Sequence, residues 1–252
     1  MHGIFLRVDY ADISLLGGRE ENQDRVAVAV TEHAALLVVV DGMGGHANGA
    51  KAAEVTQQVI LDAFAQTAQP LFDPMGFLHL TLGRAHEEVV KLGAQLPIEH
   101  RPRATCAVCL VQQGAAWWAH IGDSRLYHLR HGALVLRSRD HSHVELLLRE
   151  GLITADQAQT HPMRNFVECC LGGDPIVPDM TLTRRRPLEP NDVLLVCTDG
   201  FWAGVKDSEI ASEVGGPGVA LKEKLLELAQ RAVLRTGAAS DNTSVAALRW
   251  VG

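Results

Sequence analysis

An apolar run that ends in an acid and then in glycines limits the fold of this chain more than any other stretch. Residues 36–40 are all apolar, Asp41 follows them, and Gly42 begins a glycine-rich turn. Such a run, bounded by a turn signal, is typical of a buried strand. Asp41 is then expected at the tip of that strand with its carboxylate facing the rim, where Gly42 lets the backbone pass close to a bound group. The simpler alternative is a strand, a turn and a local cap.

The order of the expected strands and helices favours antiparallel sheets. The expected strands cover residues 4–14, 26–30, 36–40, 104–111, 115–121, 125–129, 133–136, 181–185, 193–198 and 243–250, and the expected helices cover residues 49–64, 76–94 and 221–234. Because strands come in runs and helices in separate blocks, alternating βαβ units are disfavoured. The fold class that follows is α+β, with antiparallel sheets covered by helices. We find no repeat or linker, and therefore expect one domain over residues 1–252, with an irregular insertion at 142–177 that contains short helical pieces.

Charge and hydropathy argue against several classes of protein. The chain has 252 residues, with 23 Lys and Arg against 30 Asp and Glu, for a net charge of −7. A mildly acidic chain is a poor nucleic-acid binder, and residues 184–186, all arginine, are too short a run to reverse this; we expect a solvated strand edge there. The first residues lack the pattern of a signal peptide, and no run approaches the about 18 apolar residues of a membrane span. We therefore expect a soluble, cytoplasmic protein without a membrane partner.

Cysteines and histidines offer weaker signals. Five cysteines do not suggest a disulfide framework in a chain of this length. Cys106 and Cys109 are spaced like a metal or redox pair, but residues three apart in a strand point to opposite faces, so two buried thiols are expected. His141, His143 and His161 have no spaced set of partners that would indicate zinc, and we expect them on a flap or on the surface.

Five acids fall where expected strands meet loops. They are Asp24, Asp41, Asp123, Asp199 and Asp241. If these strand ends converge on one rim, several carboxylates meet, and like charges that close stay ionised only when cations compensate them. Oxygen ligands of this kind select hard divalent ions such as Mg²⁺ or Mn²⁺ over zinc. Two such ions about 3.5–4 Å apart clamp a phosphoryl group and lower the pKa of a bridging water. The alternative is a set of turn acids scattered over the surface.

Five short motifs around these acids stand in the order and spacing of one enzyme family. They run from Arg19 to Asp24, from Val40 to Gly45, from Gly122 to Arg125, from Thr198 to Gly200 and from Asp241 to Thr243. Each motif is weak by itself, whereas five in order are highly specific, and together they cover essentially the whole chain. The chain thus resembles the metal-dependent protein phosphatases, the type 2C serine/threonine phosphatases, in their compact bacterial form. Residues 139–142, 161–166 and 171–173 are similar to the segments around the flap of that family.

The resemblance implies a fold and a set of site residues. The fold is a pair of central antiparallel sheets between antiparallel helix pairs, in α-β-β-α layers, with a two-metal site at one end and a small irregular flap at about 142–177. The implied metal ligands are Asp41, which bridges both metals; the Gly42 carbonyl, on the second; Asp199 and Asp241, on the first; Asp24, through bound water; and Asp123, on a third, looser metal. Arg19 stands at the position of the phosphate-binding arginine of the family, and a guanidinium fork matches two phosphate oxygens.

The implied activity is hydrolysis of phosphoserine and phosphothreonine in proteins. A metal-activated hydroxide attacks phosphorus in line without a phosphoenzyme, while the metals and Arg19 neutralise the charge that grows on the phosphoryl oxygens. Arg19, Asp24 and Asp41 are the implied catalytic residues, and the implied cofactors are two divalent cations, Mn²⁺ or Mg²⁺, with a weaker third. The implied partners are phosphorylated proteins, including a serine/threonine kinase or its targets, and we expect a monomer.

Three positions depart from the family pattern. Gln23 stands where many members have a glutamate, which implies a more weakly bound second metal. Met43 stands in place of a histidine that is proposed as the general acid in animal members, and that role is not transferred to the nearby His46. Ala203 stands where many members have Asp or Asn beside the third metal, which implies a weakened third site.

Three other functions are alternatives. Residues 42–47 also match the loose dinucleotide fingerprint after a strand and before a helix, although Asp41 lies where a pyrophosphate would approach. A catalytically weak or silent relative could bind a phosphoprotein as a regulatory module, which Gln23 and Ala203 allow. A phosphatase dedicated to a bacterial anti-sigma antagonist would share all the core motifs.

Overall fold

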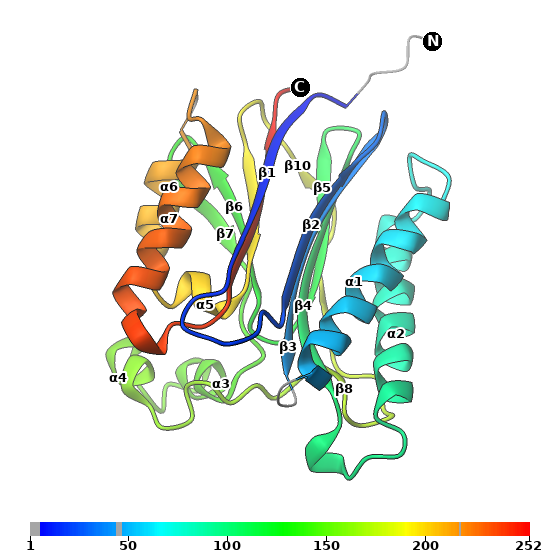
Figure 1. Cartoon of the computed structure of the whole chain (residues 1–252). Coiled ribbons are helices and arrows are strands. Elements are labelled where there is room, and N and C mark those ends of the chain that lie inside the picture. The colour runs from blue at the N-terminus through cyan, green and yellow to red at the C-terminus, as the bar shows by residue number, and fades with distance from the viewer. Residues whose placement is uncertain (1–5, 44–46, 217) are drawn as a thin grey trace.

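Two antiparallel sheets lie face to face in the middle of the protein, and helices cover the outer face of each (Figure 1). The computed structural model describes residues 6–43, 47–216 and 218–252. This layering confirms the predicted α+β fold with two central antiparallel sheets between helices.

Within the described residues, the first sheet has five strands and the second has seven. The first sheet has the order β1 (Val8–Leu15), β12 (Thr243–Trp250), β11 (Val193–Cys197), β6 (Arg125–Arg130) and β7 (Ala133–Arg137). The second has the path β10 (Arg186–Pro187), β5 (Ala115–Ile121), β4 (Arg103–Gln112), β3 (Ala34–Met43) and β2 (Asp24–Val30), with β8 (Leu171–Gly172) paired to β4 and β9 (Thr181–Leu182) paired to β5. The two sheets thus draw their strands from both halves of the chain.

The central strand β3 is apolar on both faces because both faces are covered. Leu36, Val38 and Val40 face the core under the helices, whereas Leu37 and Val39 face the core between the sheets. All five are 0 % exposed. A half-solvated strand would alternate apolar and polar residues; the uninterrupted run in β3 is the pattern of a strand buried on both sides.

Helices form the two outer layers. α1 (Ala47–Gln66) and α2 (Pro74–Leu92) cover the second sheet, while α5 (Asp199–Trp202), α6 (Asp207–Val214) and α7 (Leu221–Thr236) cover the first (Figure 1). Two short helices, α3 (His143–Arg149) and α4 (Ala155–Thr160), lie at the lower end in Figure 1. Single 3₁₀ turns occupy Ile98–His100 and Gly237–Ala239. α2 begins with Pro74, which suits the first position of a helix because the N–H it lacks would have no partner within the helix there. The Asp73 side chain caps this end by accepting a 2.9 Å hydrogen bond from the Gly76 N–H.

Alternation along a strand places neighbouring residues in different cores. Trp117 lies in the core under α1 and α2, and Trp118 lies in the core between the sheets. Cys106 and Cys109 divide in the same way and are buried free thiols, whose pKa values burial raises. The cysteines confirm the prediction from strand periodicity, and the tryptophans follow the same alternation.

Two details of the predicted elements are corrected by the structure. β3 does not end at Asp41 but continues through Gly42 to Met43, because β4 extends far enough to pair with these residues. The strand expected over 181–185 is shorter, because β9 covers only Thr181–Leu182; residues 183–185 lie outside any strand, and β10 begins after them at Arg186. The segment 142–177, expected to be irregular with short helical pieces, contains the short helices α3 and α4 together with β8.

The pairing of the strands also excludes the dinucleotide alternative. Every strand pair among the described residues is antiparallel, and α1 leads into α2 instead of a parallel strand. A dinucleotide site needs a βαβ unit with its crossover helix. Residues 44–46 of that fingerprint lie outside the described residues. No helix in the described part of the chain combines the length and the apolar character needed to cross a membrane.

Candidate active site

Two of the predicted acids face each other across the β2–β3 pair. Asp24 and Asp41 are register partners, so their backbones lie side by side at one end of the second sheet. Asp24 is 3 % exposed and Asp41 is partly buried. The Thr198 hydroxyl donates a 2.8 Å hydrogen bond to Asp24 Oδ2. Because Thr198 follows β11 of the first sheet, this bond joins the two sheets at the rim.

Two further acids reach the same rim from the first sheet. Asp199 is the first residue of α5 and follows β11, while Asp241 lies two residues before β12. Since β11 and β12 are hydrogen-bonded neighbours, the two acids leave adjacent strands at the same end. Asp199 Oδ1 is buried and has no hydrogen-bond partner among the residues that the structure describes. A buried, unpartnered carboxylate oxygen is costly unless a ligand satisfies it.

The pKa values of these acids show how closely they lie together. Burial raises the pKa of Asp41 well above its ordinary value, and the carboxylates of Asp24 and Asp199 raise it further. Burial likewise raises the pKa of Asp24 to about 7 and that of Asp199 to about 6. Carboxylates of both sheets contribute to these shifts, so the tertiary structure brings the predicted acids within electrostatic reach of one another.

Asp123 joins the cluster through a tight turn after β5. It is 6 % exposed, and burial followed by the charges of Asp199 and Asp140 raises its pKa to about 8. The Trp202 indole Nε1 donates to the Asp123 carbonyl at 3.0 Å. The Arg125 guanidinium lies 3.6 Å above the Trp202 ring and forks onto Asp140, at 2.9 and 2.8 Å. These contacts fix the turn that carries Asp123.

Arg19 is placed at the rim by the turn at Gly17 and Gly18. Gly17 has a φ of +66°, and a Cβ there would come within 2.2 Å of the Asp241 carbonyl oxygen, so only glycine allows this approach. Arg19 Nη2 lies 2.7 Å from Asp241 Oδ2, and the two side chains are 57 % and 37 % exposed. The Asp241 hydrogen bond, and then the charges of Asp199 and Asp41, raise the pKa of Arg19. An exposed guanidinium thus contacts Asp241 and lies within electrostatic reach of Asp199 and Asp41.

Two residues that tie the rim together were not singled out from the sequence. Thr198 joins the sheets through Asp24, and Asn242 accepts from the Gln23 N–H at 2.8 Å and donates to the Leu16 and Glu21 carbonyls at 2.8 and 3.0 Å. The signal in the sequence that could have identified them is their place directly beside acids in the motifs. Their partners could not be inferred, because these lie far away in the chain.

The donor set consists of oxygens only, which is the chemistry that Mg²⁺ and Mn²⁺ prefer. Among the residues that the structure describes, no group of three or more His, Cys, Asp or Glu side chains is already arranged as a metal cage. The case for metal binding therefore rests on burial, charge and the unpartnered Asp199 oxygen, which together fit divalent cations.

Gly42 gives a test of the close approach between β3 and α1. A Cβ on Gly42 would come within 2.0 Å of the Gly49 carbonyl oxygen, a backbone atom that cannot swing away. We expect Gly42→Ala to lower the free energy of unfolding by about 1–3 kcal/mol through overpacking. Gly83→Ala in α2 is the control, since a Cβ there meets nothing within 4 Å, and it should raise that free energy by about 0.5–1 kcal/mol. Urea unfolding measures both; equal effects would contradict the packing argument.

The raised pKa values predict how pH affects the metal-free protein. Asp24, Asp123 and Asp199 have folded-state pKa values of about 7, 8 and 6, above the ordinary value of 3.8. Their contribution to stability is therefore fully present below pH 3.8 and is lost as pH rises through about 6 to 8. We expect the Tm of chelator-treated protein to fall between pH 5 and pH 8, as followed by circular dichroism. A Tm that rises over this interval would contradict the clustering.

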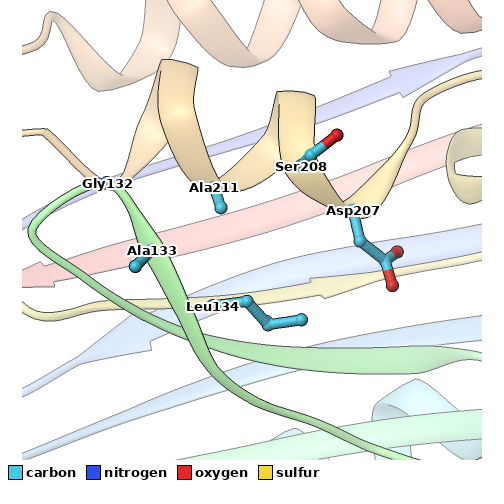
Figure 2. A pocket seen from close by; sticks show the side chains of 6 residues that line it. All are labelled: Gly132, Ala133, Leu134, Asp207, Ser208 and Ala211. Atoms are coloured by element: carbon cyan, nitrogen blue, oxygen red, sulfur yellow. The ribbon is translucent and has the colours of Figure 1, made fainter.

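A surface hollow lies elsewhere on the molecule. A cavity of about 410 Å³ lies between the β6–β7 turn and α6 (Figure 2). Its lining residues are Gly132, Ala133, Leu134, Asp207, Ser208 and Ala211. Asp207 is its one acid, and it already accepts from the Tyr127 hydroxyl and from Arg137, at 2.9 and 3.0 Å. Asp24, Asp41, Asp123, Asp199 and Asp241 form a cluster that we call the acidic rim, and this cavity has no comparable group of acids.

Comparison with known proteins agrees with the geometry of the rim. The family model described as protein phosphatase 2C matches residues 16–225. A phosphatase-2C-type protein of Streptococcus pyogenes is 33 % identical over 231 residues, which are 90 % of this chain and 91 % of that protein. The serine/threonine phosphatase of S. agalactiae has a TM-score of 0.85 at 27 % identity, over 98 % of this chain and 100 % of that one.

One similar structure contains metal. The catalytic domain of the serine/threonine protein phosphatase PstP, in complex with two manganese ions, has a TM-score of 0.81 at 27 % identity, over 97 % of this chain and 99 % of that one. The family match covers most of the chain, and the relative from S. pyogenes extends over nearly all of it. With an acidic rim built from both sheets and an arginine above it, the chain belongs to the protein phosphatase 2C family of metal-dependent serine/threonine phosphatases.

Proposed function

We propose that this protein removes phosphate from phosphoserine and phosphothreonine in protein substrates, with two divalent cations, Mn²⁺ or Mg²⁺, at the acidic rim. One observation carries the proposal. Asp24 and Asp41 from one sheet and Asp199 and Asp241 from the other are electrostatically coupled at one rim, and Arg19 stands over them. Such a cluster of buried acids is stable at neutral pH when cations compensate it. The two manganese ions of the PstP structure support the choice of metal.

Each residue has a proposed role in holding the cations. Asp41 would contact both, the Gly42 carbonyl would bind the second, Asp199 and Asp241 would bind the first, Asp24 would act through water, and Asp123 would bind a third, weaker ion. When bound, the cations supply a water of lowered pKa and neutralise charge on the phosphoryl oxygens. The unpartnered Asp199 oxygen supports its proposed role as a ligand.

The protein itself positions the phosphate and the water. Arg19 is exposed beside Asp241, so its guanidinium can turn from that carboxylate to two phosphoryl oxygens. Asp24 is held in place by the Thr198 hydroxyl, so its carboxylate is positioned to orient a water. Reaction in line with the departing oxygen requires no nucleophilic side chain, so no phosphoenzyme forms.

The expected partner enzyme is a serine/threonine kinase, whose phosphorylation of protein targets this protein reverses. The rival function is a silent phosphoprotein-binding module. Release of phosphate from a phosphothreonine peptide, measured with and without Mn²⁺, separates the two. Turnover that requires Mn²⁺ is expected; binding of the peptide without any turnover would establish the rival.

Arg19→Ala tests the phosphate contact. We expect KM for a phosphopeptide to rise by about 10- to 100-fold with a smaller change in kcat, because a charge-assisted hydrogen bond to substrate is lost. Arg235→Ala is the matched control, since Arg235 is also an exposed arginine paired with an acid, Glu209, but lies on α7. Steady-state kinetics on both variants provide the measurement, and an unchanged KM for Arg19→Ala would argue against the contact.

A further inference from the structure

Three consecutive exposed arginines form a basic patch that the phosphatase chemistry does not use. We call Arg184, Arg185 and Arg186 the arginine run; all three are exposed. None of their side chains forms an ion pair with any described residue. Eight other arginines of the described residues do form such ion pairs, as Arg130 does with Asp192 at 2.7 Å. The run is therefore a concentrated positive charge without a partner of its own.

The backbone around the run is fixed to the second sheet. Just before it, the Thr183 N–H donates to the Trp118 carbonyl at 2.9 Å. Just after it, the Leu188 N–H donates to the Gly114 carbonyl at 2.9 Å, and β10 pairs with β5. Anchoring on both sides means that little backbone freedom is lost when the run binds a ligand.

Strand β5 connects the run to the acidic rim. Thr181 is the register partner of His120, and Arg186 is the register partner of Ala116, so the run lies beside the middle and the start of β5. The other end of β5 leads directly to Asp123. At about 3.3 Å per residue, the five to seven residues from Asp123 back to this level span about 17–23 Å.

We propose that the arginine run is an exosite for an acidic segment of the protein substrate, about five to seven residues from the phosphorylated residue. An extended substrate with its phosphate at the rim would reach the run along β5. Arginine is suited to this role because its planar fork matches carboxylates. A net charge of −7 disfavours a nucleic acid as the ligand. The proposal rests on the proposed phosphatase function, because the rim sets where the phosphate lies.

The test compares matched phosphothreonine peptides. One carries three glutamates about five to seven residues from the phosphothreonine and the other carries glutamines there, with the segment placed N-terminally in one series and C-terminally in another. The variant is Arg184→Gln/Arg185→Gln/Arg186→Gln. In one of the two series, kcat/KM of the wild-type protein should be about 5- to 10-fold higher for the acidic peptide, as expected for a few exposed ion pairs. The difference should arise from a lower KM. The variant should lose that preference.

The control removes the same charge from other surfaces. Arg84→Gln/Lys91→Gln/Lys222→Gln alters exposed residues of α2 and α7 and should keep the preference. All three proteins should hydrolyse para-nitrophenyl phosphate equally, since it cannot reach the run. Raising ionic strength from about 0.05 M to about 0.5 M should reduce the preference of the wild type.

The outcomes separate the exosite from the catalytic proposal. A wild type without preference in either series, or a run variant that keeps it, would overturn the exosite. If no phosphopeptide is hydrolysed at all, the catalytic proposal fails instead. In that case, fluorescence anisotropy of the unphosphorylated acidic peptide decides the exosite: binding that the run variant loses supports it, and equal binding by both proteins overturns it.

Discussion

Asp199→Asn is expected to lower kcat for a phosphothreonine peptide by about 10³-fold or more while the fold is retained. Asp199 starts α5 after β11 and Thr198, and one of its oxygens is buried without a hydrogen-bond partner among the described residues. Asparagine has the same shape but lacks the charge that a divalent cation requires. Its neutrality also removes repulsion from Asp241 and Asp41, so the metal-free variant should be at least as stable as the wild type.

Two measurements distinguish a lost ligand from a damaged fold. Circular dichroism and the Tm of chelator-treated protein should show no loss of structure in Asp199→Asn. Asp12→Asn is the control, because Asp12 is an exposed acid of β1 in the same sheet, and it should keep wild-type activity. Near wild-type turnover by Asp199→Asn would refute the proposed role of this residue.

Removal of divalent cations with EDTA is expected to abolish turnover reversibly, with Mn²⁺ or Mg²⁺ restoring it. The acids of the rim offer only oxygen ligands, which are hard donors that suit these ions. Because the cations bind the folded protein and not the unfolded chain, they should also raise its Tm, by an amount that grows with their concentration. They should help most at neutral pH, because bound metal requires the deprotonated carboxylates whose pKa values burial has raised.

The matched control for the chelation experiment is Asp241→Asn. This variant should show a much smaller rise of Tm with Mn²⁺, because it lacks one proposed ligand from the first sheet. Restoration of wild-type activity by Zn²⁺ alone would contradict the argument from hard ligands. An activity that survives prolonged chelation would remove the metals from the proposed function altogether.

The motifs predicted the acids of the site but not the contacts that hold them. Asp24, Asp41, Asp123, Asp199 and Asp241 were each expected at a strand–loop junction, and the structure brings their charges within reach of one another. The end of β3 was placed too early, because the length of a strand depends on its neighbour. A sequence reader sees the acid after the apolar run but not the partner residues of β4 that extend the pairing to Met43.

The contacts that join the rim were beyond prediction for a similar reason. Thr198 bonds to Asp24 over a separation of 174 residues, and Arg19 bonds to Asp241 over a separation of 222 residues. Local spacing carries no information about such partners, since each depends on how the two sheets pack. The same holds for the arginine run, whose place along β5 follows from the two short strands that flank it.

The sequence by itself determined most of the strands, the three long helices and the identity of the charged groups. Periodicity and runs of apolar residues decide these features locally, because the alternation of side chains along a strand and the turn of a helix are properties of neighbouring residues. Only the tertiary structure decided that Asp41 lies opposite Asp24, that Thr198 links the sheets and that Arg19 stands over the acids. The physical reason is that burial of the apolar faces of two sheets against each other sets these distances, and that packing involves the whole chain.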